Sequence, residues 1–175
     1  MKGVENMILD DLKKYDMNTY LHCERVANLA VKIGEYLHCT KKELKILHDA
    51  ALYHDVGKLK VSLSILNKRD PLTMEDWAVI KNHPIHSLNL IKNEITDPMA
   101  REIVLYHHEN MNGTGYYKIP NISLLNQIVC VSDIYDALTS DRPYRNGFTK
   151  EKAMEIMRED HNYSDYVLNA LEANL

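Results

Sequence analysis

The apolar residues of this chain recur mostly at intervals of three and four, which is the spacing of one face of an α-helix. In residues 20–37 this spacing is held by Val26, Leu29, Ile33 and Leu37. We find no segment in which apolar and polar residues alternate over the length of a strand. The pattern therefore predicts an all-α protein.

Capping residues indicate where several of these helices begin. Thr40-Lys41-Lys42-Glu43 has the form of a capping box that opens a helix running through Ala51. Thr73 is expected to cap another helix after the break at Asp70-Pro71. Further helices are expected from about residue 85, from residue 97 to about 109, from about 124 to 141, after residue 149, and over about 165–173. Residues 1–175 are thus interpreted as one all-α domain, a helical bundle of about seven to nine helices.

Composition narrows the class of protein without changing this fold prediction. A chain of 175 residues is long enough for one domain with a sizeable core. Its net charge of −4 argues against a general nucleic-acid binder or a protein that binds anionic membranes. The three cysteines are widely spaced and odd in number, so reduced thiols are expected. The N-terminus has no apolar signal core, and no apolar run approaches the length of about 20 residues that a membrane span needs. A cytoplasmic protein is therefore expected.

Several side chains that can bind metal fall on the apolar faces of these predicted helices. Each has an apolar residue of the same helix three, four or seven positions before or after it, so it points inward. Inward-facing polar groups are costly unless they are paired or bound to metal. The five positions are His22, His54, His107, His108 and Asp133.

Two adjacent pairs, His54-Asp55 and His107-His108, strengthen the metal hypothesis. Neutral imidazoles and carboxylates are ligands for iron, manganese, zinc or nickel, and a carboxylate can bridge two ions. His83 is a further ligand candidate because it stands at a helix entrance, from which it can turn into a cleft. We therefore interpret the chain as a metal-dependent hydrolase with a paired-metal centre. The remaining histidines are expected to face solvent: His38, His48, His86 and His161.

The motifs around these residues resemble the HD superfamily of metal-dependent phosphohydrolases and, within it, the HD-GYP group of cyclic di-GMP phosphodiesterases. His54-Asp55-Val56-Gly57-Lys58 matches the HDxGK signature of the group. His107-His108-Glu109, followed by Asn112-Gly113-Thr114-Gly115-Tyr116, matches HHExxxGxGY. The segments around His22, around His83-Pro84 with Ser87, and over residues 131–145 resemble its other motifs. All five occur in order and cover nearly the whole chain.

By this resemblance, seven residues hold two divalent metal ions, and Asp55 bridges them. The family usually uses iron or manganese, so the expected metals are Fe or Mn. Members with three metals carry a glutamate one helical turn before the first histidine, where this chain has Asn18. Two metals about 3.5–4 Å apart can hold a bridging hydroxide that attacks phosphorus in line. The expected ligands are His22, His54, Asp55, His83, His107, His108 and Asp133.

The remaining site predictions concern the substrate. Lys58 lies one turn after Asp55 and is expected to meet a phosphate oxygen or the leaving oxygen, so both residues are assigned to catalysis. Tyr116 is expected to stack on a base or to bond a phosphate.

The resemblance assigns Arg142 and Arg145 to the substrate phosphate, because arginine suits paired recognition of its oxygens. The alternative for both arginines is favourable charge at a helix C-terminus. Asp136 and Asp141 are expected to orient neighbouring cations.

The chain departs from the HD-GYP pattern in one loop. Gly115-Tyr116-Tyr117 stands where Gly-Tyr-Pro is usual, and the loop that follows is shorter. The expected function is hydrolysis of cyclic di-GMP to linear pGpG, to GMP, or to both. Two alternatives stay open: an HD phosphohydrolase for another nucleotide or phosphoester, and a catalytically silent module that binds a nucleotide or a partner.

The expected partners follow from the same reasoning. They are a cyclic dinucleotide or other phosphoester substrate and a regulatory or diguanylate cyclase protein, with no general nucleic-acid binding and no membrane. The family often fuses such modules to a sensor or receiver domain, which this sequence lacks. It is therefore either a stand-alone enzyme or a catalytic domain from a longer protein.

Overall fold

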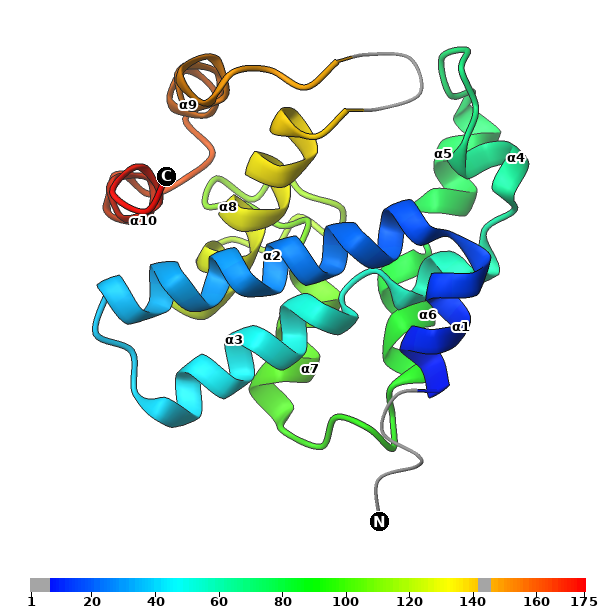
Figure 1. The fold of residues 1–175 in the computed structure, drawn as a ribbon, viewed down its shortest axis with the longest axis horizontal. Helices are drawn as coiled ribbons and strands as arrows, with labels where there is room; N and C mark the ends of the chain where they lie inside the picture. The colour runs from blue at the N-terminus through cyan, green and yellow to red at the C-terminus, as the bar shows by residue number, and fades with distance from the viewer. Residues whose placement is uncertain (1–6, 142–145) are drawn as a thin grey trace.

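The structure, a computed structural model, describes residues 7–141 and 146–175. These residues form nine α-helices of seven or more residues, a four-residue helix α4 and a 3-10 helix η1, and they contain no strand (Figure 1). The all-α prediction is therefore confirmed. None of these helices is both long and apolar enough to cross a membrane. In chain order the elements are α1 (Met7–Tyr15), α2 (Met17–Tyr36), α3 (Lys41–Tyr53), η1 (Val56–Lys60), α4 (Leu63–Leu66), α5 (Met74–Ile80), α6 (His83–Leu90), α7 (Pro98–Tyr106), α8 (Leu124–Thr139), α9 (Lys150–Glu159) and α10 (Asp165–Glu172).

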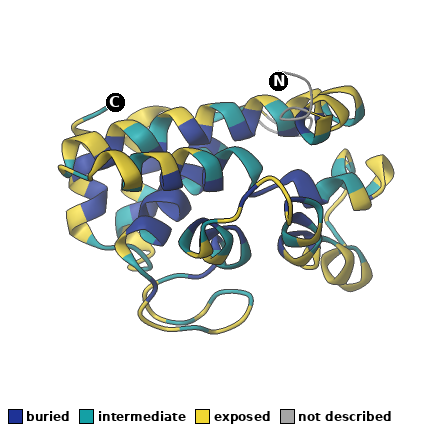
Figure 2. Ribbon diagram, turned by 90° about the horizontal axis from the view of Figure 1, so that it is seen from below, coloured by how far each residue is buried: buried dark blue, intermediate teal, exposed yellow. Residues whose placement is uncertain are grey.

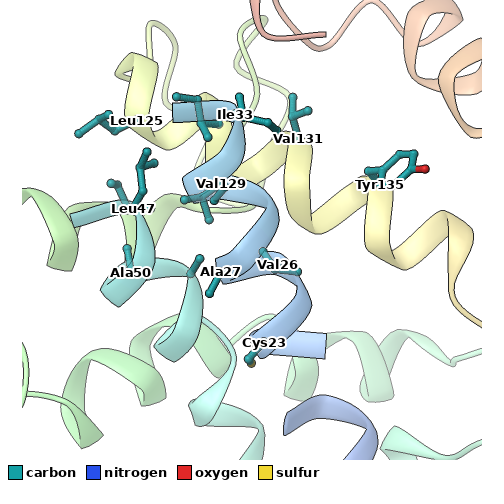
Figure 3. Packing of buried hydrophobic residues seen from close by; sticks show 14 of the residues in the cluster. Cys23, Val26, Ala27, Ile33, Leu47, Ala50, Leu125, Val129, Val131 and Tyr135 are labelled. Atoms are coloured by element: carbon teal, nitrogen blue, oxygen red, sulfur yellow. The ribbon is translucent and has the colours of Figure 1, made fainter. Parts of the chain in front are cut away.

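Helix α2 crosses the middle of the molecule and packs mainly against α3 and α8. Val26 and Ala27 of α2 are buried, as are Ala50 of α3 and Val129 of α8. Figure 3 shows these side chains meeting where the three helices converge. Small residues at this contact allow a short distance between the helix axes. The core therefore holds α2, α3 and α8 in a fixed arrangement, and this arrangement positions the polar side chains that α2 and α8 carry.

The predicted caps are present. Thr40 accepts a hydrogen bond from the Glu43 amide at 3.3 Å, and the Glu43 carboxylate accepts one from the Thr40 amide at 2.7 Å. Thr73 and Asp76 form the same reciprocal pair at the start of α5. Asp97, Thr149 and other short polar residues also accept amide hydrogen bonds at their helix starts. These capping residues therefore mark the starts of α3, α5, α7 and α9 as the sequence predicted.

Three helix boundaries differ from the sequence prediction. Helix α6 begins at His83 and not near residue 85, and α8 ends at Thr139 and not at residue 141. Helix α7 ends at Tyr106 and not near Glu109. There the Glu109 amide donates to the Tyr106 carbonyl at 2.9 Å, which is a tight turn across three residues. The chain leaves the helix at this point, and the Glu109 carboxylate accepts hydrogen bonds from two amides of the loop that follows.

Helices α4 and α5 form a lobe at one end of the molecule, opposite α9 and α10 (Figure 1). Neither α4 nor α5 contains a buried residue. In Figure 2 the same end of the molecule is mostly exposed, in contrast to the buried faces of the long helices. The lobe is therefore attached to the core through its two ends, η1 and α6, and not through an apolar face of its own.

Gly57 allows η1 to approach α6 closely. Its amide donates to Ser87 Oγ at 2.8 Å, and Ser87 Oγ donates to the His54 carbonyl at 2.7 Å. A Cβ atom on Gly57 would lie 2.0 Å from the His83 carbonyl oxygen and 2.5 Å from the Ser87 amide nitrogen, both of them backbone atoms. The glycine and the small serine thus let the segments of His54 and His83 lie side by side.

We expect Gly57→Ala to lower the free energy of unfolding by about 3 kcal/mol, because the new methyl group meets backbone that has no room to shift. Urea denaturation of the two proteins measures this difference. Gly34→Ala is the matched control. Its Cβ would come too close only to the terminal methyl groups of Leu47 and Leu44, which can rotate away, and would lie at an ordinary 3.7 Å from Cys39 Cβ. A Gly57→Ala protein no less stable than Gly34→Ala would contradict the close approach of η1 and α6.

Candidate metal centre

Three of the buried histidines are oriented in the same way by helix ends. Each lies just after the last turn of α3, α5 or α7, and its Nδ1 contacts the backbone carbonyl oxygen three residues earlier. Helices leave their last carbonyl groups without an internal partner, so these oxygens are available. A carbonyl oxygen only accepts, so Nδ1 carries the proton and a neutral ring keeps its lone pair on Nε2. The contacts are His54 to Ala51 at 2.7 Å, His83 to Ile80 at 2.7 Å and His107 to Val104 at 2.8 Å.

His22 needs a different partner because it lies within α2, where the carbonyl groups are already used. Its Nδ1 donates to Asp136 Oδ2 at 2.6 Å, and Arg25 Nε donates to the other Asp136 oxygen at 2.6 Å. Burial alone would raise the pKa of Asp136, but the hydrogen bonds from His22 and Arg25 lower it to about 2. Asp136 is therefore an ionised acceptor that fixes the orientation of the His22 ring, with Nε2 directed toward Asp133 and Asp55. The expectation that Asp136 orients its neighbours agrees with these contacts.

The two carboxylate oxygens of Asp55 face two different groups of histidines. Oδ2 lies 3.4 Å from Nε2 of His54 and 3.7 Å from Nε2 of His22. Oδ1 lies 3.1 Å from Nε2 of His83 and 4.0 Å from Nε2 of His107. We name these the His22 group (His22, His54, Asp55) and the His83 group (Asp55, His83, His107, His108). Within each group, the possible ligand atoms all lie within 4.8 Å of one another.

Asp133 and His108 complete the cluster. Asp133 Oδ1 lies 2.9 Å from Nε2 of His22, and its Oδ2 lies 3.8 Å from Nδ1 of His108. Burial alone would raise the pKa of Asp133, but His22 and the neighbouring imidazoles together outweigh burial and hold the pKa well below its ordinary value. All seven residues that the sequence proposed as metal ligands therefore lie together, although they come from segments spread over more than 100 positions.

The donor set fits a divalent cation. Nε2 of His54 and Oδ1 of Asp55 are buried and have no hydrogen-bond partner within the described part of the chain. Nε2 of His83 and Nε2 of His107 lie 3.1 Å apart with their lone pairs facing each other. Burial also lowers the pKa of His107 and brings that of His108 to about 3, so both rings are neutral at pH 7. Unpaired acceptors converging in a buried site are costly, and a cation among them removes that cost.

Lys58 stands between two cavities beside this cluster. Its Nζ donates to Asp55 Oδ2 at 2.5 Å. Burial lowers the pKa of Lys58, but the charge of Asp55, the hydrogen bond to it and the charge of Asp133 together raise the pKa by more, so the side chain is cationic. The larger cavity, about 720 Å³, reaches His83 and His108, and the smaller one, about 420 Å³, reaches His22. Lys58 lines both cavities, which places a positive charge where each of them opens onto the ligands.

The loop after His108 is held by a buried carboxylate whose role the sequence analysis missed. Glu109 is fully buried, and its two oxygens accept hydrogen bonds from the amides of Tyr117 at 2.7 Å and Ile119 at 2.8 Å. Proline has no amide hydrogen, so Tyr117 supplies a donor that the usual Gly-Tyr-Pro motif lacks. A glutamate directly after the histidine pair and before a glycine-containing loop was the signal available in the sequence.

This loop places Tyr116 at the cluster. Its ring centroid lies 4.4 Å from that of His108, and the residue lines the larger cavity. A Cβ atom on the preceding Gly115 would lie 2.4 Å from the His108 carbonyl oxygen, so a glycine is needed there. Tyr116 therefore packs against the His108 ring and lines the same cavity as this ligand.

Other predicted residues contribute less to the site. Arg142 and Arg145 lie outside the described residues. Asp141 accepts a hydrogen bond from the Gly147 amide at 2.8 Å. The cations next to it in the sequence, Arg142 and Arg145, lie outside the described residues, so its role in orienting them stays a prediction. Among the remaining histidines, His38, His48 and His161 are exposed as expected and His86 is half-buried.

Comparison with known proteins identifies the family. A family model described as the HD domain matches residues 4–166. The chain belongs to the HD domain family. This confirms the resemblance stated from the sequence motifs, and the paired His54-Asp55 at the centre of the cluster matches the family's HD signature.

Similar HD-domain proteins include two curated phosphodiesterases. A cyclic di-GMP phosphodiesterase of Pseudomonas aeruginosa is 33% identical over 88% of this chain and 38% of its own length. A 3′3′-cGAMP-specific phosphodiesterase of Vibrio cholerae is 35% identical over 79% of this chain and 31% of its own. The chain thus spans well under half the length of these relatives. The solved HD domain of the L. monocytogenes phosphodiesterase PgpH shares the fold at 19% identity, with a TM-score of 0.73 over 95% of this chain and 94% of that one.

We expect Asp136→Asn to weaken divalent metal binding about 10-fold to 100-fold, because the variant loses the ionised acceptor that orients His22. Titration with Mn²⁺, followed by isothermal calorimetry, measures this change. Ser140→Ala is the matched control, since Ser140 Oγ also contacts Asp136 Oδ2, at 3.2 Å, but does not touch His22. Equal metal affinity in Asp136→Asn and the wild type would show that His22 keeps its orientation without Asp136.

Proposed function

We propose that this HD domain is a metal-dependent phosphodiesterase that hydrolyses cyclic di-GMP to linear pGpG, to GMP, or to both. The observation that carries the proposal is the position of Asp55. Its two oxygens face separate groups of histidines whose Nε2 lone pairs are directed inward. The two curated relatives are phosphodiesterases of cyclic dinucleotides, which supports the same substrate class for this chain.

The proposed cofactor is a pair of divalent ions, Fe or Mn, with Asp55 as the bridging ligand. The His22 group would bind one ion and the His83 group the other, and Asp133 lies close enough to both His22 and His108 to join either. Imidazole and carboxylate ligands suit both metals. Asn18, at the position where three-metal members carry glutamate, lines the smaller cavity as a neutral side chain. This favours two ions over three.

A bound metal pair supplies an activated water and neutralises charge on the phosphoryl oxygens. The chain's own residues would orient the phosphodiester. Lys58, cationic and facing both cavities, is proposed to bind a phosphoryl oxygen or the leaving oxygen. Tyr116, beside His108, is proposed to contact a base or a phosphate oxygen. Arg142 and Arg145 are proposed as further phosphate contacts on the basis of the family resemblance.

The cavities suit a ligand with two arms. A cyclic dinucleotide has a central ring of two phosphodiesters with one base on either side. The larger and smaller cavities adjoin at Lys58 and Leu66, which line both. One phosphodiester at the metal ligands would therefore leave a base in each direction with a space to enter.

The first test is metal analysis of protein purified without added metal, run beside cyclic di-GMP hydrolysis with Fe²⁺ or Mn²⁺ supplied. We expect about two ions per chain and turnover. Asp55→Ala should lose metal and activity together, because Asp55 is the one residue that belongs to both ligand groups. Retention of two ions by Asp55→Ala would contradict its bridging role.

The outcomes also separate the alternatives. Two ions without turnover of cyclic di-GMP, but with turnover of another nucleotide or phosphoester, would indicate a different HD phosphohydrolase. Two ions and binding of cyclic di-GMP without turnover of any phosphoester would indicate a silent binding module. A chain that binds no metal after loading would overturn the proposal.

We expect Lys58→Gln to lower kcat/KM for the cyclic dinucleotide by about 100-fold, because the charged contact to the reacting phosphodiester is lost. The metal content should remain at the wild-type level, since Lys58 is not a ligand. Lys60→Gln is the matched control, because Lys60 is exposed and lines neither cavity. Loss of metal from Lys58→Gln would instead mean that its ion pair with Asp55 maintains the cluster.

A further inference from the structure

The larger cavity extends well beyond the metal ligands. From His83 and His108 it continues to the lobe of α4 and α5, where Trp77 and Leu72 contribute apolar surface. Arg69 and Asp70 line the same part of the cavity. A reacting phosphodiester needs the end with the histidines, so the walls at the other end are available for another part of the ligand.

The loop that carries Arg69 and Asp70 is closed by an ion pair. Lys68 Nζ donates to Asp76 Oδ2 at 2.5 Å, and the Thr73 amide donates to the same oxygen at 2.9 Å. These two contacts join the two ends of the loop and start α5 at a fixed point. The side chains of residues 69–72 are therefore presented to the cavity by an anchored loop, even though the lobe has no buried residue of its own.

Arg69 and Asp70 have no hydrogen bond and no ion pair to any residue in the described ranges 7–141 and 146–175, and both are exposed. Two adjacent charged side chains of opposite sign thus line one cavity with their hydrogen-bonding groups unused. Asp70 disfavours a second phosphate at this end, since a carboxylate repels it. A neutral ring with donors and acceptors side by side suits the pair better.

Guanine is such a ring. Its N1–H and N2–H₂ groups are donors that one carboxylate can accept together, and its O6 and N7 are acceptors for a guanidinium. Adenine presents an acceptor at N1, which a carboxylate cannot bond, and a donor at N6, which a guanidinium cannot bond. Trp77, with 44% of its surface exposed, offers an aromatic face on which a base can stack.

We propose that Arg69, Asp70 and Trp77 form a guanine subsite that selects the base of the cyclic dinucleotide. This rests on the proposed function, in which the phosphodiester lies at the metal ligands. One subsite of this kind accepts any substrate that has a guanine to place there. Cyclic di-GMP and 3′3′-cGAMP can therefore both make the paired hydrogen bonds there, whereas an adenine of cyclic di-AMP can only stack on Trp77.

The test compares kcat/KM for these three cyclic dinucleotides in the metal-loaded wild type and in Asp70→Asn and Arg69→Gln. We expect each variant to lose about 10-fold to 100-fold on the two guanine-containing substrates and less than about three-fold on cyclic di-AMP. Trp77→Leu should instead reduce all three alike, because stacking does not distinguish the purines. Glu75→Gln, which removes an exposed charge of α5 outside the cavity, is the matched control and should change none.

Hydrolysis of bis(p-nitrophenyl) phosphate, which has no nucleobase, checks the metal site and should be unchanged in Asp70→Asn and Arg69→Gln. An equal loss on all three cyclic dinucleotides would assign the pair to phosphate binding and overturn the subsite. Unchanged kinetics, or a wild type that prefers cyclic di-AMP, would overturn it as well. A wild type that cleaves only the base-free ester would refute the proposed substrate class and the subsite with it, whereas the other outcomes leave the proposed function in place.

Discussion

The arrangement of this site depends on where each buried imidazole places its proton. At the ends of α3, α5 and α7, a free backbone carbonyl binds the Nδ1–H of a histidine and leaves its Nε2 lone pair facing Asp55. The same helix ends carry partial negative charge, which adds to the attraction for a cation. The three helices must therefore stop at particular residues, and the fold positions these three histidines by ending helices, whereas Asp133 is presented from within α8. His22 is the exception, and it needs the separate carboxylate of Asp136 because it lies inside a helix.

This constraint explains why the tightest backbone contact of the site lies between η1 and α6. His54 and His83 come from segments that must approach within the width of one carboxylate. Gly57 and Ser87 make that approach possible, one by having no side chain and the other by linking two backbone groups through a single hydroxyl. The glycine of the HDxGK signature is therefore a packing requirement of the metal centre, and the lysine after it is the residue available to the substrate.

The sequence predicted the helices and the ligands more fully than it predicted the contacts between segments. Helix faces placed His22 and Asp133 inward, and caps such as Thr40 located the helix starts, because both signals are local. The motif resemblance added His83, which periodicity left only as a candidate. The end of α7 and the role of Glu109 were missed, because they depend on the amides of Tyr117 and Ile119 in a loop folded back by the tertiary structure. For Asp136, the sequence predicted that it orients a neighbouring cation, but it did not identify His22 and Arg25 as the donors.

The charge balance explains how an acidic chain can attract an anionic substrate. The chain has a net charge of −4, and the ligand cluster itself contains two ionised carboxylates, those of Asp55 and Asp133. Lys58 and His54 hold the pKa of Asp55 well below its ordinary value against the effect of burial. Two divalent ions would more than compensate the charges of Asp55 and Asp133 and, with Lys58, would leave the site positive. In a partly dehydrated cleft this local field outweighs distant surface charges, which solvent and salt screen. Substrate attraction and metal loading would then be coupled, because without the ions the same cleft would present carboxylates to a phosphate.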